Sequence, residues 1–193
     1  MRALYATGLA YIGLCAGLFW FGRPGLAPAV GPQVRPTHPP SSLNGPEWFR
    51  AMKPFCNPVE VDTRIRFAPP PAGGEGAAYG AGCLALAGKI ERARSMLLEL
   101  PPGARQSAAN IVFELAHPVA DAGDDRAAGP IMELVVEFAP GNSMALYHAG
   151  ASGYALGHAA SARRNLTRFL EIYQQADGWT SNARQMLGRL GPQ

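Results

Sequence analysis

Two of the three cysteines are placed where a covalent link between them can be expected. Cys56 and Cys83 are the only two outside the N-terminal apolar stretch, which is of the kind that directs export. Cysteines in an oxidising compartment pair as disulfides, and the spacing of these two fits no zinc motif. We therefore expect a Cys56–Cys83 disulfide, with two free buried thiols as the alternative.

The histidines give no spacing typical of a catalytic or metal centre. Among the four, His117 has a carboxylate, Asp121, one helical turn further on, and this spacing puts both side chains on one helix face. We interpret these two residues as a structural pair that satisfies its own polar groups, because no nucleophile or second histidine lies at a matching spacing. No glycine-rich phosphate loop follows a strand either. We expect a protein that is not an enzyme and that has no catalytic residue, bound metal or cofactor.

The charge of the chain argues against nucleic acid as a partner. The net charge is only +3, and no basic run or basic-aromatic stripe appears among the 193 residues. The apolar fraction of 48% is sufficient for a folded core. Composition therefore leaves proteins and membranes as the partners to consider.

The N-terminal segment is long and apolar enough to span a membrane. Ala3 to Gly22 contains no charged residue and is long enough to cross a bilayer as a helix. We expect residues 1–22 to be a retained single-pass anchor. The alternative is a signal peptide that is cleaved after Ala27-Pro28-Ala29.

Small residues recur along one face of this expected helix. Their alternating spacing of four and three positions lines them up, and Gly13 to Gly17 forms a small-xxx-small motif that permits close helix approach. We expect this face to pack on integral membrane protein subunits, with chance in an Ala/Gly-rich segment as the alternative. The face consists of Ala6, Ala10, Gly13 and Gly17.

Residues 23–46 read as a proline-rich extended linker. The many prolines in this segment exclude helix and interior strand and favour a polyproline conformation. The linker is either a spacer or a strap that lies along a partner. Residues 47–74 then form a short helical unit at the N-terminal end of the folded domain, with Trp48 and Phe49 as apolar anchors.

The second half of the chain repeats itself with a period of about 34 residues, a length that predicts stacked helical hairpins. Three times a turn glycine is followed, five positions later, by an alanine. The marker pairs are Gly88/Ala93, Gly123/Ala128 and Gly157/Ala162. The expected helix pairs are 75–87 with 90–100, 104–121 with 125–138, and 142–156 with 159–174. A last helix at 178–190 would cover the open apolar end through Trp179, Met186 and Leu187.

The hairpins resemble the tetratricopeptide repeat family. The third repeat matches best, with Met144 to Gly150, then Tyr154 and Gly157, then Ala162, Leu166 and Phe169. The resemblance covers about three degenerate repeats over 75–190. It implies an all-α, right-handed solenoid of helical hairpins, preceded here by the transmembrane helix and the linker.

The resemblance also implies a concave groove lined by the first helix of each repeat. The groove would bind a protein segment of apolar or proline-rich character, although the same aromatic residues would also suit a core between repeats. The groove positions in the second and third repeats are Asn110, Phe113, His117, Asp121, Met144, Tyr147 and Tyr154. In the first repeat they are Glu75, Ala78, Gly82 and Ala85.

Together these features predict a non-catalytic scaffold. We expect an accessory or assembly subunit of a multi-subunit bacterial membrane complex, of respiratory or photosynthetic kind by analogy. It would be anchored in the inner membrane with its repeat domain in the periplasm. The alternative is a soluble periplasmic adaptor, released by signal cleavage, that binds peptides or envelope proteins.

Overall fold

The part of the chain that the computed structural model describes, residues 42–191, is entirely helical and contains no strand. The all-α prediction is confirmed for this part. The predicted anchor at 1–22, with its small-residue face, and most of the predicted linker lie outside it. The helices are α2 (Gly45–Met52), the 3-10 helix η1 (Lys53–Phe55), α3 (Val61–Phe67), α4 (Gly74–Leu86), α5 (Ile90–Leu98), α6 (Pro102–Asp121), α7 (Asp125–Phe138), α8 (Ser143–Ala155), α9 (Ala159–Ile172) and α10 (Gly178–Leu190).

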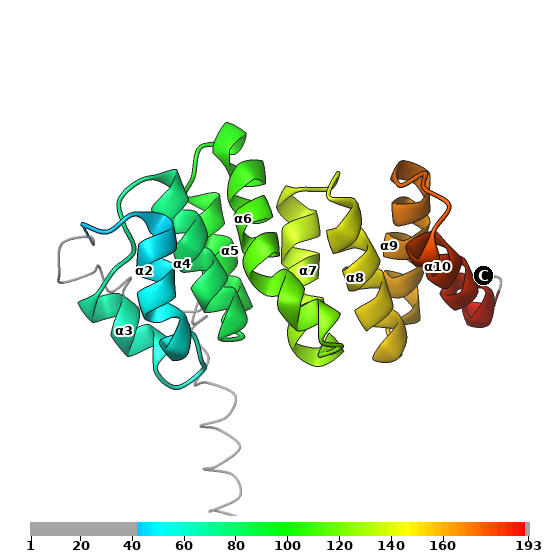
Figure 1. The fold of residues 1–193 in the computed structure, drawn as a ribbon, viewed down its shortest axis with the longest axis horizontal. Coiled ribbons are helices and arrows are strands. Elements are labelled where there is room, and N and C mark those ends of the chain that lie inside the picture. Colours follow the sequence, from blue (N-terminus) through cyan, green and yellow to red (C-terminus); the bar gives the residue numbers. More distant parts are fainter. Residues whose placement is uncertain (1–41, 192–193) are drawn as a thin grey trace, which may run out of the picture. The chain divides into compact units, whose positions relative to one another are not determined.

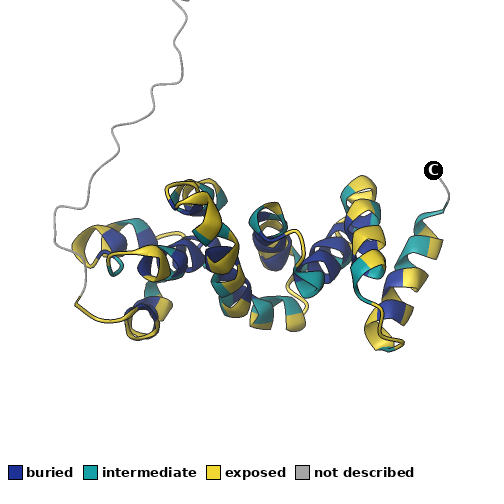
Figure 2. Cartoon of the chain, turned by 90° about the horizontal axis from the view of Figure 1, so that it is seen from above, coloured by how far each residue is buried: buried dark blue, intermediate teal, exposed yellow. Residues whose placement is uncertain are grey.

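Helices α4 to α9 form three successive hairpins (Figure 1). Each hairpin packs its own two helices together. The first hairpin packs on the second mainly through α4 and α6, and the second packs on the third through α7 and α8. Helix α10 packs on α9 and α8 at the C-terminal end. Buried residues face neighbouring helices and exposed residues lie on the outer surfaces (Figure 2). Within residues 42–191, no helix combines the length and the apolar character that a bilayer crossing requires.

The three marker glycines end the first helix of each hairpin in the same way. Gly88, Gly123 and Gly157 have φ values of 71°, 75° and 78°, a left-handed conformation that favours glycine. After α4, the Gly88 N–H donates to the Ala85 carbonyl and the Lys89 N–H donates to the Leu84 carbonyl, both at 2.9 Å. The other two turns repeat this pair of bonds, which defines a Schellman cap. The predicted period is therefore a repeated turn in the structure.

Small residues allow the two helices of a hairpin to approach closely. The marker alanines in the second helices are completely buried. In the third hairpin, a Cβ added to Gly150 would lie 2.6 Å from Cγ of Leu166 on α9. Only a residue without a side chain fits there, since a core at native density has no room for an additional carbon.

Two prolines lie inside helices that continue through them. Pro118 is in the last turn of α6, and Pro130 is in the second turn of α7. Each proline removes one backbone hydrogen bond, but neither ends its helix early. Packing of both helices against their neighbours maintains the helical path.

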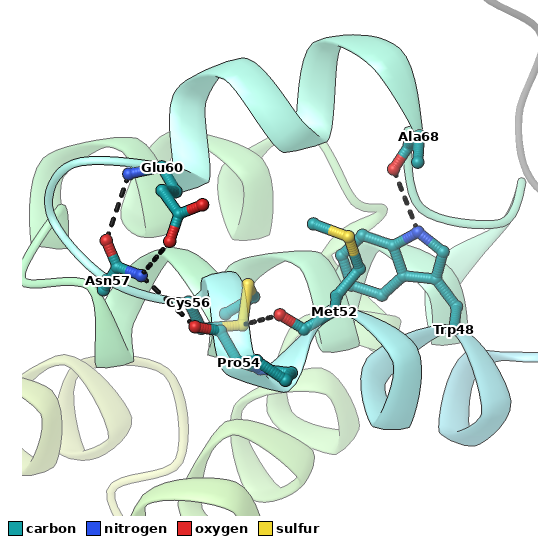
Figure 3. The surroundings of a disulfide bond; sticks show 8 residues. Trp48, Met52, Pro54, Cys56, Asn57, Glu60 and Ala68 are labelled. Carbon is teal, nitrogen blue, oxygen red and sulfur yellow. Dashed lines mark hydrogen bonds between the residues drawn. A yellow bond between two sulfur atoms is a disulfide. The ribbon is translucent and has the colours of Figure 1, made fainter.

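In the unit before the first hairpin, a buried tryptophan joins α2 to the end of α3, and a disulfide joins the unit to the hairpin (Figure 3). Helix α2 begins with a capping box at Asn44 and packs against α4. Trp48 is only 2% exposed, and its indole N–H donates to the Ala68 carbonyl at 3.0 Å. Cys56 and Cys83 are bonded, with their Cα atoms 4.9 Å apart. The predicted disulfide is confirmed, and it joins the loop after η1 to the first helix of the first hairpin.

Helix α10 packs apolar residues against the C-terminal end of the hairpins. Asp177 caps it by accepting hydrogen bonds from the Trp179 and Thr180 N–H groups. Ala183 joins the core formed by α8 and α9, whereas Trp179 remains 37% exposed. Met186 and Leu187, also predicted to cover the apolar end, are partly buried against that core, and Trp179 lies at its edge.

Candidate functional site

Aromatic and imidazole rings from three helices form a continuous row, which we call the ring row. It consists of Phe113 and His117 on α6, Tyr147 and His148 on α8, and Trp179 on α10. Phe113 and His117 are one turn apart and stack with centroids 4.7 Å apart. The Tyr147 ring meets the Trp179 ring edge-to-face at 4.8 Å. The row therefore joins the first helices of the second and third hairpins to the C-terminal helix.

Two histidines meet within this row. The Nε2 atoms of His117 and His148 are 3.1 Å apart, so the one that carries hydrogen donates to the other. Asp121 Oδ1 lies 3.3 Å from the first of these nitrogens and 3.6 Å from the second. We call these three side chains the His–His–Asp cluster. The predicted contact between His117 and Asp121 is present, and His148 is the residue that spacing along the chain did not indicate.

The cluster is buried on one side and open on the other. The side-chain exposures of His148, His117 and Asp121 are 7%, 29% and 52%. Burial lowers the pKa of His148, and the neighbouring His117 adds to this effect, whereas Asp121 and Asp125 oppose it. His148 is therefore favoured in its neutral form, held against the rings of Tyr147 and Trp179.

The predicted groove residues of the second and third hairpins fall into two groups. Phe113 and Tyr147 are 6% and 7% exposed and belong to the core between hairpins. Asn110 is exposed and accepts a hydrogen bond from Asn142 at 3.1 Å, while Met144 is half-buried. Tyr154, near the end of α8, is also half-buried. This second group is accessible to a partner, as are the predicted groove residues Asp121 and, in part, His117 of the His–His–Asp cluster.

The corresponding positions of the first hairpin are mostly closed. Ala78, Gly82 and Ala85 are buried, and a Cβ added to Gly82 would lie 2.4 Å from a side-chain carbon of Leu115 on α6. Glu75 alone is exposed. These small residues serve the close packing of α4 on α6 rather than an open surface.

The second helices of the hairpins are joined by polar contacts instead of rings. Arg94 on α5 donates to Glu137 on α7 at 2.8 Å. Glu133 on α7 accepts from the buried amide of Asn165 on α9 at 2.8 Å and from Arg164 at 3.4 Å. The partly exposed ion pairs from Arg94 and Arg164 contribute at most about 1 kcal/mol each, whereas the hydrogen bond from Asn165 satisfies a buried amide.

No protein-family model, no curated protein and no solved structure matches this chain. Its own sequence and geometry are therefore the grounds on which a function can be assigned.

Proposed function

We propose that this protein is a non-catalytic, membrane-anchored scaffold. In this proposal residues 75–190 are a right-handed solenoid of the tetratricopeptide type. Residues 1–22 hold it in the inner membrane of a bacterium, and the repeats lie in the periplasm. It acts as an accessory or assembly subunit of a multi-subunit membrane complex.

The observation that carries the proposal is the triple repetition of one hairpin. The same glycine turn closes α4, α6 and α8, and each hairpin packs on the next. Arrays of this kind present extended surfaces, and their usual role is to hold other proteins. The uncharged stretch from Ala3 to Gly22 supports attachment to a membrane. The disulfide supports an oxidising compartment such as the periplasm.

The accessible groove residues indicate the kind of protein segment that would bind. Met144 and Tyr154 offer flexible and aromatic apolar surface, and Asn110 offers an amide at the edge. Outside the predicted groove positions, the half-open Trp179 of the ring row adds a further aromatic side chain. Such a surface suits an apolar or proline-rich segment, because it contains apolar contact area with few charges. The small-residue face of residues 1–22 and the linker would contact the integral membrane subunits.

A topology measurement on the native membrane tests this proposal. The full chain should remain with membranes after alkaline washing, and protease added to spheroplasts should digest the repeats. Its intact mass should include residues 1–29. A mature protein that starts at Val30 and is released with the periplasmic fraction would refute the anchor.

The soluble periplasmic adaptor is the second candidate, and Ala27-Pro28-Ala29 is the observation that favours it. In that case the same groove would bind peptides or envelope proteins without a membrane subunit. The intact-mass measurement separates the two candidates directly.

A further inference from the structure

Three metal-ligating atoms converge in the His–His–Asp cluster, at a place where the proposed scaffold function requires none. Nε2 of His117, Nε2 of His148 and a carboxylate oxygen of Asp121 all lie within 4.8 Å of one another. Two of these residues come from α6 and one from α8. The cluster is therefore produced by the packing of two hairpins, and it is independent of the membrane anchor.

The distances between the three atoms match three corners of a tetrahedral metal site. Zinc binds imidazole nitrogen and carboxylate oxygen at about 2.0–2.2 Å, so neighbouring ligand atoms of a tetrahedral ion are about 3.3–3.6 Å apart. The observed separations are 3.1, 3.3 and 3.6 Å. An ion about 2.05 Å from all three atoms would lie about 0.7 Å out of their plane, as a tetrahedral ion does.

We propose that His117, His148 and Asp121 bind a single Zn²⁺ ion with a fourth position open to water. The chemistry of the ligands sets the class of metal. Imidazole nitrogens suit zinc and its neighbours among the transition metals, whereas Mg²⁺ and Ca²⁺ require oxygen ligands. Two neutral imidazoles and one carboxylate leave a net charge of +1 on the bound ion.

The surroundings hold the ligands in place before the ion arrives. His148 packs edge-on against the rings of both Tyr147 and Trp179, at centroid distances of 5.4 and 5.8 Å. His117 stacks on Phe113, and the exposed Asp121, at the end of α6, lies on the side from which an ion can enter. Ligation uses both Nε2 lone pairs, so the hydrogen on one Nε2 moves to Nδ1 of the same ring. A bound ion would join α6 to α8 across two hairpins.

The experiment uses the full chain in detergent, purified with a tag that contains no histidine. Zinc titration by calorimetry, together with metal analysis after desalting, should give one Zn²⁺ per chain. Zinc should raise the melting temperature because it binds only the folded arrangement, and magnesium should not. His117→Gln should weaken zinc binding about tenfold or more, because even an outer-shell change costs about 10–100-fold.

His158→Gln is the matched control, because His158 is exposed at the start of α9 and does not belong to the cluster. It should bind zinc like the unaltered chain. Asp121→Asn keeps the size of the side chain and removes its charge, so it tests the site even if His117→Gln unfolds the protein. It should also bind zinc more weakly. No zinc binding by the unaltered chain, or equal binding by folded His117→Gln or Asp121→Asn, would overturn the proposal.

Discussion

Removal of the Cys56–Cys83 disulfide should destabilise the protein strongly while leaving its helices in place. The cleanest perturbation is the double substitution Cys56→Ser and Cys83→Ala. Cys83 is completely buried, so serine there would add the cost of a buried hydroxyl, about 1–3 kcal/mol, to the effect being measured. Cys56 is half-buried at the surface, where serine is harmless.

The expected magnitude follows from the length of chain that the disulfide closes. The sequence separation of the two cysteines is 27. In the chain-entropy model, a loop of this length destabilises the unfolded state by about 3.5 kcal/mol at room temperature. Domains of this size have free energies of unfolding of about 5–15 kcal/mol, so the loss is a large fraction of the total. The native helices should persist, because Trp48 remains buried and still donates to the Ala68 carbonyl.

Urea denaturation followed by circular dichroism measures this effect. The double variant should unfold at a lower urea concentration than the oxidised chain, and reduction of the unaltered chain should reproduce the shift. Cys15→Ser is the matched control and should leave the midpoint unchanged. Equal midpoints for the double variant and the oxidised chain would refute the reasoning. So would three titratable thiols in the denatured, unreduced protein.

Three further predictions concern other parts of the chain. Gly150→Ala should lower the melting temperature, because overpacking against α9 costs about 1–3 kcal/mol and outweighs a helix-propensity gain of about 1 kcal/mol. The hydrogen bond from the Tyr173 hydroxyl lowers the pKa of Asp177, and hydrogen bonds from backbone N–H groups lower it further. The ionised Asp177 therefore stabilises the fold above the unfolded pKa of about 3.9, and this stabilisation is lost as pH falls through the lower folded pKa. Asp177→Asn, which retains the cap, should therefore flatten the acid dependence of the melting temperature below about pH 4. Gly13→Leu should disturb assembly in native gels while membrane insertion persists, because it removes close helix approach without adding polarity.

Matched controls accompany these predictions. Gly188→Ala changes the same residue type within α10, where an added Cβ meets nothing within 4 Å, so it should stabilise the protein by up to about 1 kcal/mol. A drop in melting temperature equal to that of Gly150→Ala would show that packing is not the cause. Asp124→Asn alters another helix cap and should leave the acid dependence of the melting temperature that Asp177 causes unchanged. Leu14→Ala lies off the small-residue face and should affect assembly less than Gly13→Leu.

The hairpins could be predicted from the sequence because their turns impose a local requirement. A Schellman turn needs a left-handed residue, and Gly88, Gly123 and Gly157 meet that need at a nearly constant period. The bounds of α4 to α10 lie close to the predicted ranges for the same reason. The Cys56–Cys83 disulfide could also be predicted, because these are the only two cysteines outside the N-terminal apolar stretch.

The His–His–Asp cluster could not be found from spacing within a helix. The sequence separation of His117 and His148 is 31. This separation is shorter than the repeat of about 34 residues by about one helical turn. They therefore occupy neighbouring rather than equivalent positions of adjacent hairpins, and a search for periodic residues passes over them. The sequence signal that could have revealed the pair was this separation of 31, a few residues short of the repeat. Phe113 and Tyr147, which are one full repeat apart, occupy equivalent positions, and packing between hairpins buries both.

The central claim, that the chain is an anchored subunit of a membrane assembly, is tested most directly by native mass spectrometry. The complex would be extracted from membranes in mild detergent through a C-terminal tag on the full chain. We expect one mass that contains this chain, with residues 1–29 present, together with integral membrane proteins in a fixed stoichiometry. We expect that mass to be lost for Gly13→Leu. A chain that is released as a monomer, with no membrane protein attached, would contradict it.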